Sequence, residues 1–241
     1  PTAKLDSRVG DEIKRLGAQE VIIVGGQDSV SERVREDLKA YDADKNVERI
    51  AGADRYGTSE MVAKRVVGIT GKKNTGVVAS GQVFPDALSV GTFASREGYP
   101  ILLVKKDSVP SQIQNAIKDL DINKTYIAGG TNTISKATEA NLPNVVERMA
   151  GSTRYETSVA IAKSKFGASK EAYIASGEEF ADALVISPVS GKYNRPTLLV
   201  STKEANNVPV RSYVKDSKIS KLTAIGGQRY VPSSVIDNLV K

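Results

Sequence analysis

The residues of this chain that could do chemistry are polar side chains that occur twice in the same order. Arg55 and Tyr56 recur as Arg154 and Tyr155, and a threonine follows each tyrosine two positions later. A guanidinium beside an aromatic ring suits a ligand with anionic groups and sugar rings, because arginine binds phosphate through two parallel hydrogen bonds. The alternative is that each arginine forms a salt bridge between repeated units.

Two aspartates and two serines also recur. Asp86 and Asp182 lie in F-x-D-A-L segments, and Ser80 and Ser176 lie in A-S-G segments. Each aspartate falls in the first turn of an expected helix, where a carboxylate stabilises the helix but repels a phosphate. We therefore expect the aspartates either to stabilise helix starts or to orient sugar hydroxyls or a nearby arginine.

The composition excludes several classes of enzyme. The chain has no cysteine and no histidine, so it offers no thiolate nucleophile, no imidazole base and no cysteine or histidine metal ligand. Ser80 or Ser176 would need a lysine base, yet no S-x-x-K motif starts at either serine. A glycosidase needs two carboxylates, but Asp54 of the first copy is Thr153 in the second. We expect no catalytic residue, no metal site and no cofactor.

Length and charge limit the other possibilities. The 241 residues are 40% apolar and 26% charged, which is typical of a soluble globular protein. The formal charge of +6 is too small for a nucleic-acid-binding arm, but positive charge increases toward the C-terminus, which favours either an anionic partner or a solvated lysine-rich surface. No apolar run is long enough to span a membrane. Pro1 is not an initiator methionine, and we expect any signal peptide to be absent from this chain.

Internal repetition is the strongest signal in the sequence. Residues 49–59 and 148–158 share the pattern R-x-A-G-x-x-R-Y-x-T-S. In both copies A-S-G-x-x-F-x-D-A-L and P-x-L-L-V follow, and each copy ends with an apolar run and two glycines. A third such end stands at residues 21–26. We expect two complete units, 49–147 and 148–241, preceded by the back half of another at 1–48.

Each unit is expected to alternate strands and helices. Residues 77–79 and 101–104 are short apolar runs, typical of strands buried on both faces. Apolar residues at helical spacing predict a helix over 58–67. Three positions are expected helix starts: Ser31, Ser135 and Pro232. This alternation predicts a small α/β sandwich with parallel strands in each unit.

The ordered set of motifs resembles a known family. R-I-A-G-A-D-R-Y, A-S-G-Q-V-F-P-D-A-L, P-I-L-L-V and Y-I-A-G-G are similar to the type 2 cell-wall-binding repeat of clostridial and related Gram-positive surface proteins. The resemblance implies tandem Rossmann-like or toprim-like three-layer α/β domains, with mostly parallel sheets, packed with pseudo-threefold symmetry. It also implies a non-catalytic module that binds an anionic wall polysaccharide (a secondary wall polymer) and retains a secreted protein on the bacterial cell wall. Other surface-layer proteins are further implied partners.

The family links its P-I-L-L segment to anchoring. The segment falls on Pro100, Ile101, Leu102 and Leu103, and on Pro196, Leu198 and Leu199. Leucines in a continuous apolar run are typical of a core strand, so their expected role is to hold the neighbouring loop in place. The expected ligand-binding residues are Arg55, Tyr56, Ser80, Asp86, Arg154, Tyr155, Ser176 and Asp182.

Two other functions stay open from the sequence. A nucleotide- or phosphate-binding enzyme would use the glycine turns for phosphate and Asp86 for magnesium, although neither A-S-G nor I-G-G has the spacing of a known phosphate loop. A purely structural spacer would bury its units against one another and bind no glycan.

Overall fold

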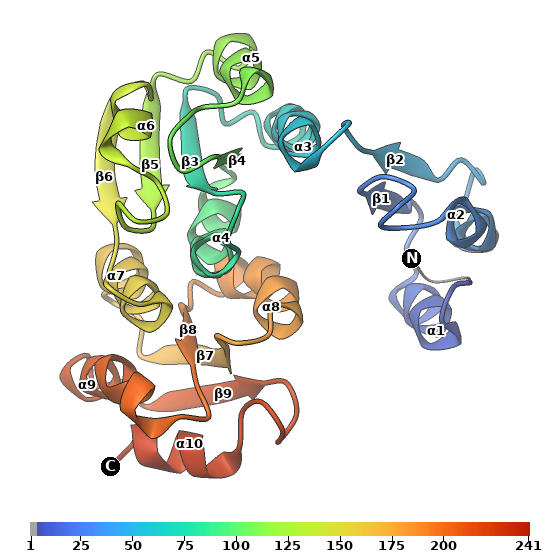
Figure 1. The fold of residues 1–241 in the computed structure, drawn as a ribbon. Helices are drawn as coiled ribbons and strands as arrows, with labels where there is room; N and C mark the ends of the chain where they lie inside the picture. Colours follow the sequence, from blue (N-terminus) through green and yellow to red (C-terminus); the bar gives the residue numbers. More distant parts are fainter. Residues whose placement is uncertain (1–3) are drawn as a thin grey trace.

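The computed structural model describes residues 4–241 and shows an α/β chain of repeated units (Figure 1). The N-terminal part contains α1 (Ser7–Leu16), β1 (Ile22–Val24), α2 (Glu32–Leu38), a 3₁₀ turn (Lys39–Tyr41) and β2 (Glu48–Ile50). The middle part contains α3 (Arg55–Thr70), β3 (Thr75–Ser80), α4 (Pro85–Glu97), β4 (Ile101–Val104), α5 (Ser111–Asp119), β5 (Lys124–Ala128), α6 (Lys136–Ala140) and β6 (Val145–Met149). The C-terminal part contains α7 (Arg154–Phe166), β7 (Glu171–Ser176), α8 (Ala181–Lys192), β8 (Thr197–Val200), a 3₁₀ turn (Glu204–Asn207), α9 (Val208–Asp216), β9 (Lys221–Ile225) and α10 (Ser233–Leu239).

The strands form three sheets in which every pairing is parallel. Their orders are β1-β2, β4-β3-β5-β6 and β8-β7-β9. Because parallel strands need crossover connections, helices cover both faces of the second sheet. In the second sheet, Val78 packs with α3 and α5, whereas Val77 and Ala79 pack with α4 and α7. The expected α/β class with mostly parallel sheets is confirmed.

The local sequence signals explain where most helices begin. The Ser31 and Ser135 hydroxyls accept hydrogen bonds from Val34 N at 3.3 Å and Thr138 N at 3.4 Å, so both expected N-caps are confirmed. Pro232 is the N-cap of α10. The expected helix over 58–67 is longer and begins at Arg55. The Asp54 carboxylate caps it by accepting hydrogen bonds from the backbone N–H groups of Tyr56 and Gly57.

The strands that carry the R-x-A-G motif complete the sheet of the preceding unit. β2 pairs with β1, and β6 pairs with β5. The chain then passes directly into α3 or α7, which belongs to the following unit. The sequence boundaries at residues 49 and 148 therefore fall inside these two strands, and neighbouring units are interlocked by them.

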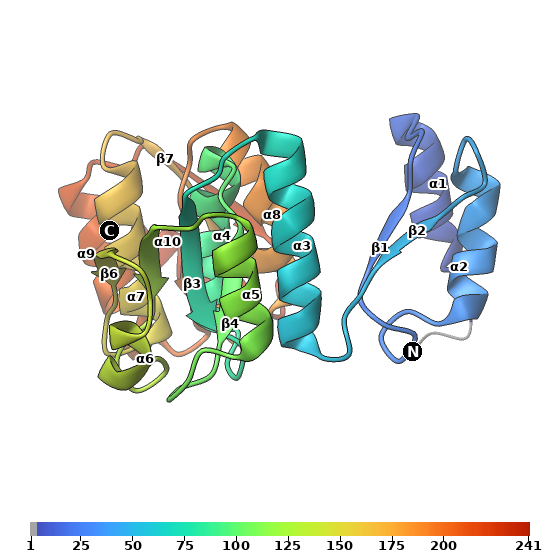
Figure 2. The same ribbon diagram turned by 90° about the horizontal axis from the view of Figure 1, so that it is seen from above.

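Two helices form the main contact between the second and third units. α4 and α8 lie side by side (Figure 1). The Ser95 hydroxyl of α4 donates to Ser187 O of α8 at 3.0 Å, and the Ser187 hydroxyl donates to Leu88 O at 3.3 Å. The N-terminal part, by contrast, lies beside α3 on the other side of that helix (Figure 2). Among the described residues, no helix is both long and apolar enough to cross a membrane.

Candidate functional site

The candidate site lies at the carboxyl edge of the second sheet, where the second and third units meet. A cavity of about 180 Å³ opens there. Its walls come from the start of α4, the loop after β5 and the segment from β6 into α7, including Asp86, Gly130, Thr133, Arg154 and Thr157. Because β6 completes the second unit's sheet, it delivers the first residues of α7 to the edge of that sheet. The site is therefore composed of two units.

Asp86 is the buried acid of this cavity. Only 6% of the residue is exposed, although it lies in the first turn of α4, as expected. Thr133 Oγ1 donates to its carboxylate at 3.3 Å. Burial raises the pKa of the Asp86 carboxyl, while hydrogen bonds from Thr133 and Thr157 and the charge of Arg154 act to lower it. Asp86 thus joins α4, the loop after β5 and α7.

The glycine pair after each last strand makes room for this aspartate. Gly129 has a φ of +110°, and a Cβ at this position would collide with the Asp86 carboxylate. Gly226 has a φ of +108° and stands in the same relation to Asp182. Only glycine combines this backbone conformation with such a close approach. The glycine turn therefore accommodates a carboxylate rather than a phosphate.

The two repeated arginines have the same local contact but different surroundings. Arg154 Nη1 donates to Gly177 O at 2.5 Å, and Arg55 Nη1 donates to Gly81 O at 2.5 Å. Both arginines are exposed, and each lies at the carboxyl edge of a sheet. Arg154 acts electrostatically on Asp86 of the preceding unit. The structure thus brings Asp86 together with Arg154, and not with Arg55 of its own unit.

Arg55 instead faces a second, wider cavity beside the N-terminal part. This cavity of about 530 Å³ is lined by the loop after β1, by the start of α3 and by Ile101 and Leu103 of β4. It corresponds to the first cavity, but none of the described residues supplies the counterpart of α4 and its aspartate. Asp182 likewise lies beside Gly226, and within the described part of the chain no later unit places an arginine beside it.

The starts of α3 and α7 are already occupied by carboxylates of the chain itself. In α7, Thr153 and Glu156 form a capping box, and Glu156 Oε2 accepts from Ser152 N at 2.6 Å. In α3, Asp54 Oδ1 accepts from Gly57 N at 2.8 Å. A carboxylate at a helix start satisfies the free N–H groups and repels a second anion. An anion at either site would have to bind the arginine side chain.

Tyr56 and Tyr155 are core residues in the structure. They are only 8% and 7% exposed, and their rings pack against Gly81 and Gly177, where a Cβ would overlap the ring. A sugar cannot stack on a ring face that the protein already covers. The expected stacking role does not fit this burial, and the reason is that the glycine of the A-S-G motif leaves a space that the tyrosine fills.

Ser80 and Ser176 are also buried and shape the loops of the site. The Ser80 hydroxyl accepts from Gln82 N at 3.1 Å and Val83 N at 3.3 Å. The Ser176 hydroxyl accepts from Glu178 N at 3.1 Å and Glu179 N at 3.2 Å. Each serine thus holds the turn between a strand and the helix that carries the aspartate. A direct ligand contact by either serine stays a prediction.

The two P-x-L-L segments form β4 and β8. Pro100 O accepts from Val77 N, and Pro196 O accepts from Tyr173 N, at 2.9 Å in both cases. Leu102, Leu198 and Leu199 are fully buried, whereas Ile101 and Leu103 are partly buried and line the second cavity. The interpretation of these leucines as core strand residues agrees with their burial.

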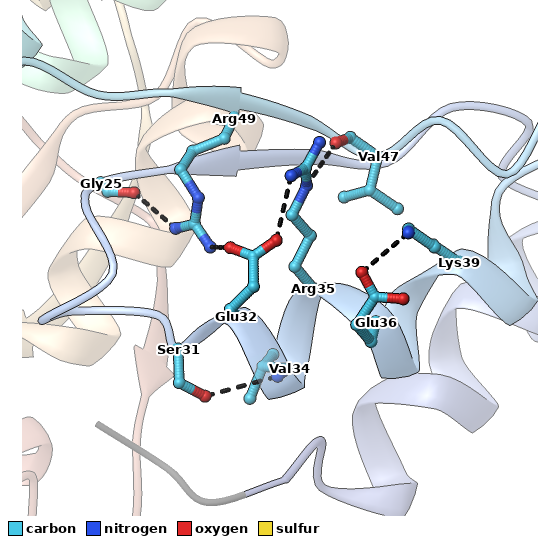
Figure 3. Close-up of polar contacts among 9 residues, drawn as sticks. All are labelled: Gly25, Ser31, Glu32, Val34, Arg35, Glu36, Lys39, Val47 and Arg49. Carbon is cyan, nitrogen blue, oxygen red and sulfur yellow. Dashed lines mark hydrogen bonds and ion pairs between the residues drawn. The ribbon is translucent and has the colours of Figure 1, made fainter.

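Sequence reasoning missed the first arginine of the R-x-A-G motif. Arg49 Nη1 donates to Gly25 O at 2.8 Å, and its guanidinium forms an ion pair with Glu32 of α2 at 3.3 Å (Figure 3). Arg148 repeats this arrangement with Gly129 O at 2.8 Å and with Glu139 at 2.9 Å. The signal was present, because the arginine recurs in every copy of the motif. It fixes the glycine turn that accommodates the aspartate.

An exposed aromatic pair was missed as well. Phe84 and Phe180 precede α4 and α8, and their rings meet edge to face with centroids 5.6 Å apart. Both are largely exposed in the described chain. In the part of the chain that the structure describes, no three Asp, Glu, His or Cys residues gather in a way that could hold a metal ion.

Comparison with known proteins finds a match to each of the two complete repeats. The sequence pattern of the family described as "Cell wall binding domain 2 (CWB2)" matches residues 49–139 and 148–236. The chain belongs to this family. The two CWB2 matches begin at Arg49 and Arg148, the first residues of the two R-x-A-G motifs.

Two relatives from Bacillus subtilis (strain 168) match nearly the whole chain. The chain is 30% identical over 236 residues to N-acetylmuramoyl-L-alanine amidase LytC, covering 98% of this chain and 46% of that protein. It is 31% identical over 233 residues to an amidase enhancer, covering 95% of this chain and 30% of that protein. The chain thus spans less than half of the length of each relative.

Two solved structures have the same fold. Cwp6 from Clostridium difficile superposes with a TM-score of 0.81 at 26% identity, covering 99% of this chain and 39% of that one. Cwp8 from Clostridium difficile gives a TM-score of 0.80 at 25% identity, covering 98% of this chain and 40% of that one. The CWB2 architecture of tandem α/β repeats is therefore confirmed.

Proposed function

We propose that this chain is a non-catalytic module that binds an anionic wall polysaccharide and retains a surface protein on a Gram-positive cell wall. The observation that carries the proposal is the composite site, in which an exposed arginine of one CWB2 unit stands beside a buried aspartate of the preceding unit. The guanidinium would bind an anionic group of the polymer, and the cavity beside it would take an adjoining sugar.

The geometry favours binding over phosphate chemistry. Arg154 projects at the carboxyl sheet edge, while Glu156 and Asp54 occupy the helix starts that a nucleotide phosphate would need. Asp86 is buried and faces two threonines and an arginine, so it lacks the open, oxygen-rich surroundings that magnesium prefers. Asp86 is better suited to hold Arg154 in place.

Repetition strengthens weak sites on a repeating polymer. When a second unit binds the same polysaccharide molecule, it acts at a high effective concentration. Two or three weak contacts therefore raise avidity by roughly 10²- to 10⁴-fold. Several weak contacts can therefore retain a protein without a covalent bond. We infer that surface-layer proteins share the same polymer with this module, at the cell wall.

The experiment is co-sedimentation with purified Gram-positive walls, before and after removal of the anionic polymer. We expect the parent chain to bind untreated walls, to lose binding when the polymer is removed, and to bind less as salt is raised. Arg154→Gln should lower affinity about 10-fold or more, since hydrogen bonds to charged groups contribute about 1.5–3 kcal/mol. Arg55→Gln is the matched comparison, because it removes the same backbone contact at a cavity that has no counterpart of Asp86, and it should lower affinity less.

Three other outcomes would contradict either the proposed site or the proposed function. Equal binding by folded Arg154→Gln and parent would refute the site while leaving the family intact. Saturable binding of ATP and magnesium, with turnover, would support the nucleotide enzyme instead. A chain that binds neither walls nor nucleotide would be a structural spacer.

A further inference from the structure

Arg154 lies on the wall of two neighbouring cavities at the carboxyl sheet edge. One is the cavity of about 180 Å³ that it shares with Asp86. The other, which we call the outer hollow, has about 580 Å³ and is lined by Ser152, Thr153, Arg154, Tyr155 and Glu178. The first three of these residues line both cavities. A group bound to the Arg154 guanidinium therefore lies next to the outer hollow and to Glu178.

Glu178 places a carboxylate at a fixed point of the outer hollow. The residue is exposed, but its Oε1 accepts from Ser201 Oγ at 2.7 Å, and Ser201 is fully buried. Ser201 is held in turn, because its backbone N–H donates to Oδ1 of the buried Asn207 at 2.8 Å. None of the residues 4–241 forms an ion pair with this carboxylate, and its Oε2 accepts no hydrogen bond from them. One oxygen thus positions the group, and the other is open to a ligand.

The second unit has no carboxylate at the corresponding place. There the counterpart of Glu178 is Gln82, whose Oε1 accepts from Lys106 N at 2.7 Å. The counterpart of Ser201 is the exposed Lys105. In both units the side chain joins the loop after one strand to the loop after the neighbouring strand. This contact needs only an oxygen that accepts a hydrogen bond, so the fold does not require the charge of Glu178.

The charge of Glu178 does matter to a ligand on Arg154. A ligand with anionic groups alone is attracted by the guanidinium and repelled by the carboxylate across the same hollow. A ligand that also carries an ammonium group a few atoms from its anionic group meets an opposite charge at each point. An ammonium offers three hydrogen-bond donors, which suits a carboxylate with a free oxygen.

We propose that Arg154 and Glu178 together select a polysaccharide that carries free amino groups close to its anionic groups. The guanidinium binds the anionic group, Glu178 binds the ammonium group, and the outer hollow holds the atoms between them. Glu178 is then a specificity-determining residue of the composite site. The inference rests on the proposed function, because it takes Arg154 as the residue that binds the anionic group of the polymer.

The test measures how well the polymer released from purified Gram-positive walls competes with the walls for the chain in co-sedimentation. The polymer is used as released or after N-acetylation, which converts its amino groups into neutral amides. For the parent chain, we expect N-acetylation to weaken competition about 2- to 5-fold, the effect of one exposed ion pair. For Glu178→Gln, we expect no response to N-acetylation. The N-acetylated polymer should also bind this variant more tightly than the parent, because the repulsion by Glu178 is gone.

The structure supplies controls for folding and for net charge. Glu178→Gln introduces the residue that the second unit already has at this position, and its urea unfolding should match that of the parent. Asp216→Asn removes one negative charge as well. It changes the exposed last residue of α9, at the edge where the strands of the third sheet begin. It should respond to N-acetylation as the parent does.

Two results would overturn the inference and leave the proposed function intact. If N-acetylation weakened competition equally for the parent and for Glu178→Gln, the amino groups would bind elsewhere on the chain. If it weakened competition for neither, the polymer would be recognised through its anionic groups alone. A parent chain that does not bind the walls at all would overturn the proposed function, and this inference with it.

Discussion

Asp86 makes the stability of the chain depend on pH. Burial raises the pKa of its carboxyl, so the folded state holds the proton more tightly than the unfolded state. As pH rises through the pKa of the folded state, ionisation of Asp86 lowers the free energy of unfolding. At a pH below the pKa of the unfolded state, the carboxyl is neutral in both states and this loss is absent. The cost is about 1.4 kcal/mol for each unit by which the pKa is raised.

We therefore expect Asp86→Asn to raise the free energy of unfolding near neutral pH. The difference from the parent should shrink as the solution is acidified, because the parent carboxyl then becomes neutral. Urea unfolding across this pH range measures it. Asp182→Asn is the control at the same motif position, and it should have a smaller effect because Asp182 is only partly buried. A variant that is less stable at every pH would show that the contacts with Thr133 and Arg154 outweigh burial.

Arg148 is the second residue whose replacement should change the stability of the chain. It joins Gly129 O and Glu139, and only 13% of its side chain is exposed. Arg148→Met should lower the free energy of unfolding by about 2 kcal/mol, since hydrogen bonds to charged groups contribute about 1.5–3 kcal/mol. Arg148→Lys should recover only part of this, because an ammonium does not reproduce the planar fork. Denaturant unfolding of both variants measures these losses. If Arg148→Met had the same free energy of unfolding as the parent, the glycine turn would not need the arginine for its stability.

At the scale of elements, α3 and α7 begin with different caps. Glu156 completes a capping box in α7, whereas Gly57 stands at the corresponding position of α3. Glu156→Ala should cost about 1 kcal/mol of stability, the usual effect of losing a helix cap. Thermal unfolding measures this loss. A shift no larger than that of an exposed control, such as Lys163→Ala in the last turn of α7, would show that Thr153 alone is a sufficient cap.

Element positions followed from the sequence better than element boundaries. The strand expected at 101–104 is β4 at the same residues, because proline and a charged lysine bracket a short apolar run. The strand expected at 77–79 extends to Thr75–Ser80, and the helix expected over 58–67 extends to Arg55–Thr70. Both are longer than expected because polar residues at their ends are held by caps and by sheet pairing, which apolar periodicity does not reveal.

At the scale of the whole molecule, the close approach of α4 and α8 depends on glycine. A Cβ at Gly191 would collide with the Ser95 hydroxyl and lie 2.7 Å from Arg96 N. Gly191→Ala should therefore destabilise the contact between units by about 1–3 kcal/mol, the usual cost of overpacking. Gly68→Ala is the matched control in α3, where nothing lies within 4 Å. It should stabilise by about 0.5–1 kcal/mol, because alanine lowers the entropy of the unfolded chain.

Urea unfolding of the two glycine variants provides the comparison. Opposite signs are expected. If Gly191→Ala were as stable as the parent, the helices would be able to separate without loss, and the units would be less rigidly joined than their contacts indicate. The pseudo-threefold packing implied by the family resemblance stays a prediction, since the described residues include only two helices of the α4 type.

The sequence by itself determined the repeat, the α/β class and the residue types of the candidate site, because repetition and apolar periodicity are local properties of a chain. Only the tertiary structure decided which of those residues meet. The R-x-A-G strand pairs with the preceding unit, so Arg154 faces Asp86 across a unit boundary and not within its own repeat. Burial of Tyr56 and Tyr155 was equally hidden, because it depends on a glycine more than twenty positions away that leaves space for each ring. Spacing along a chain does not report such contacts; strand pairing and packing do.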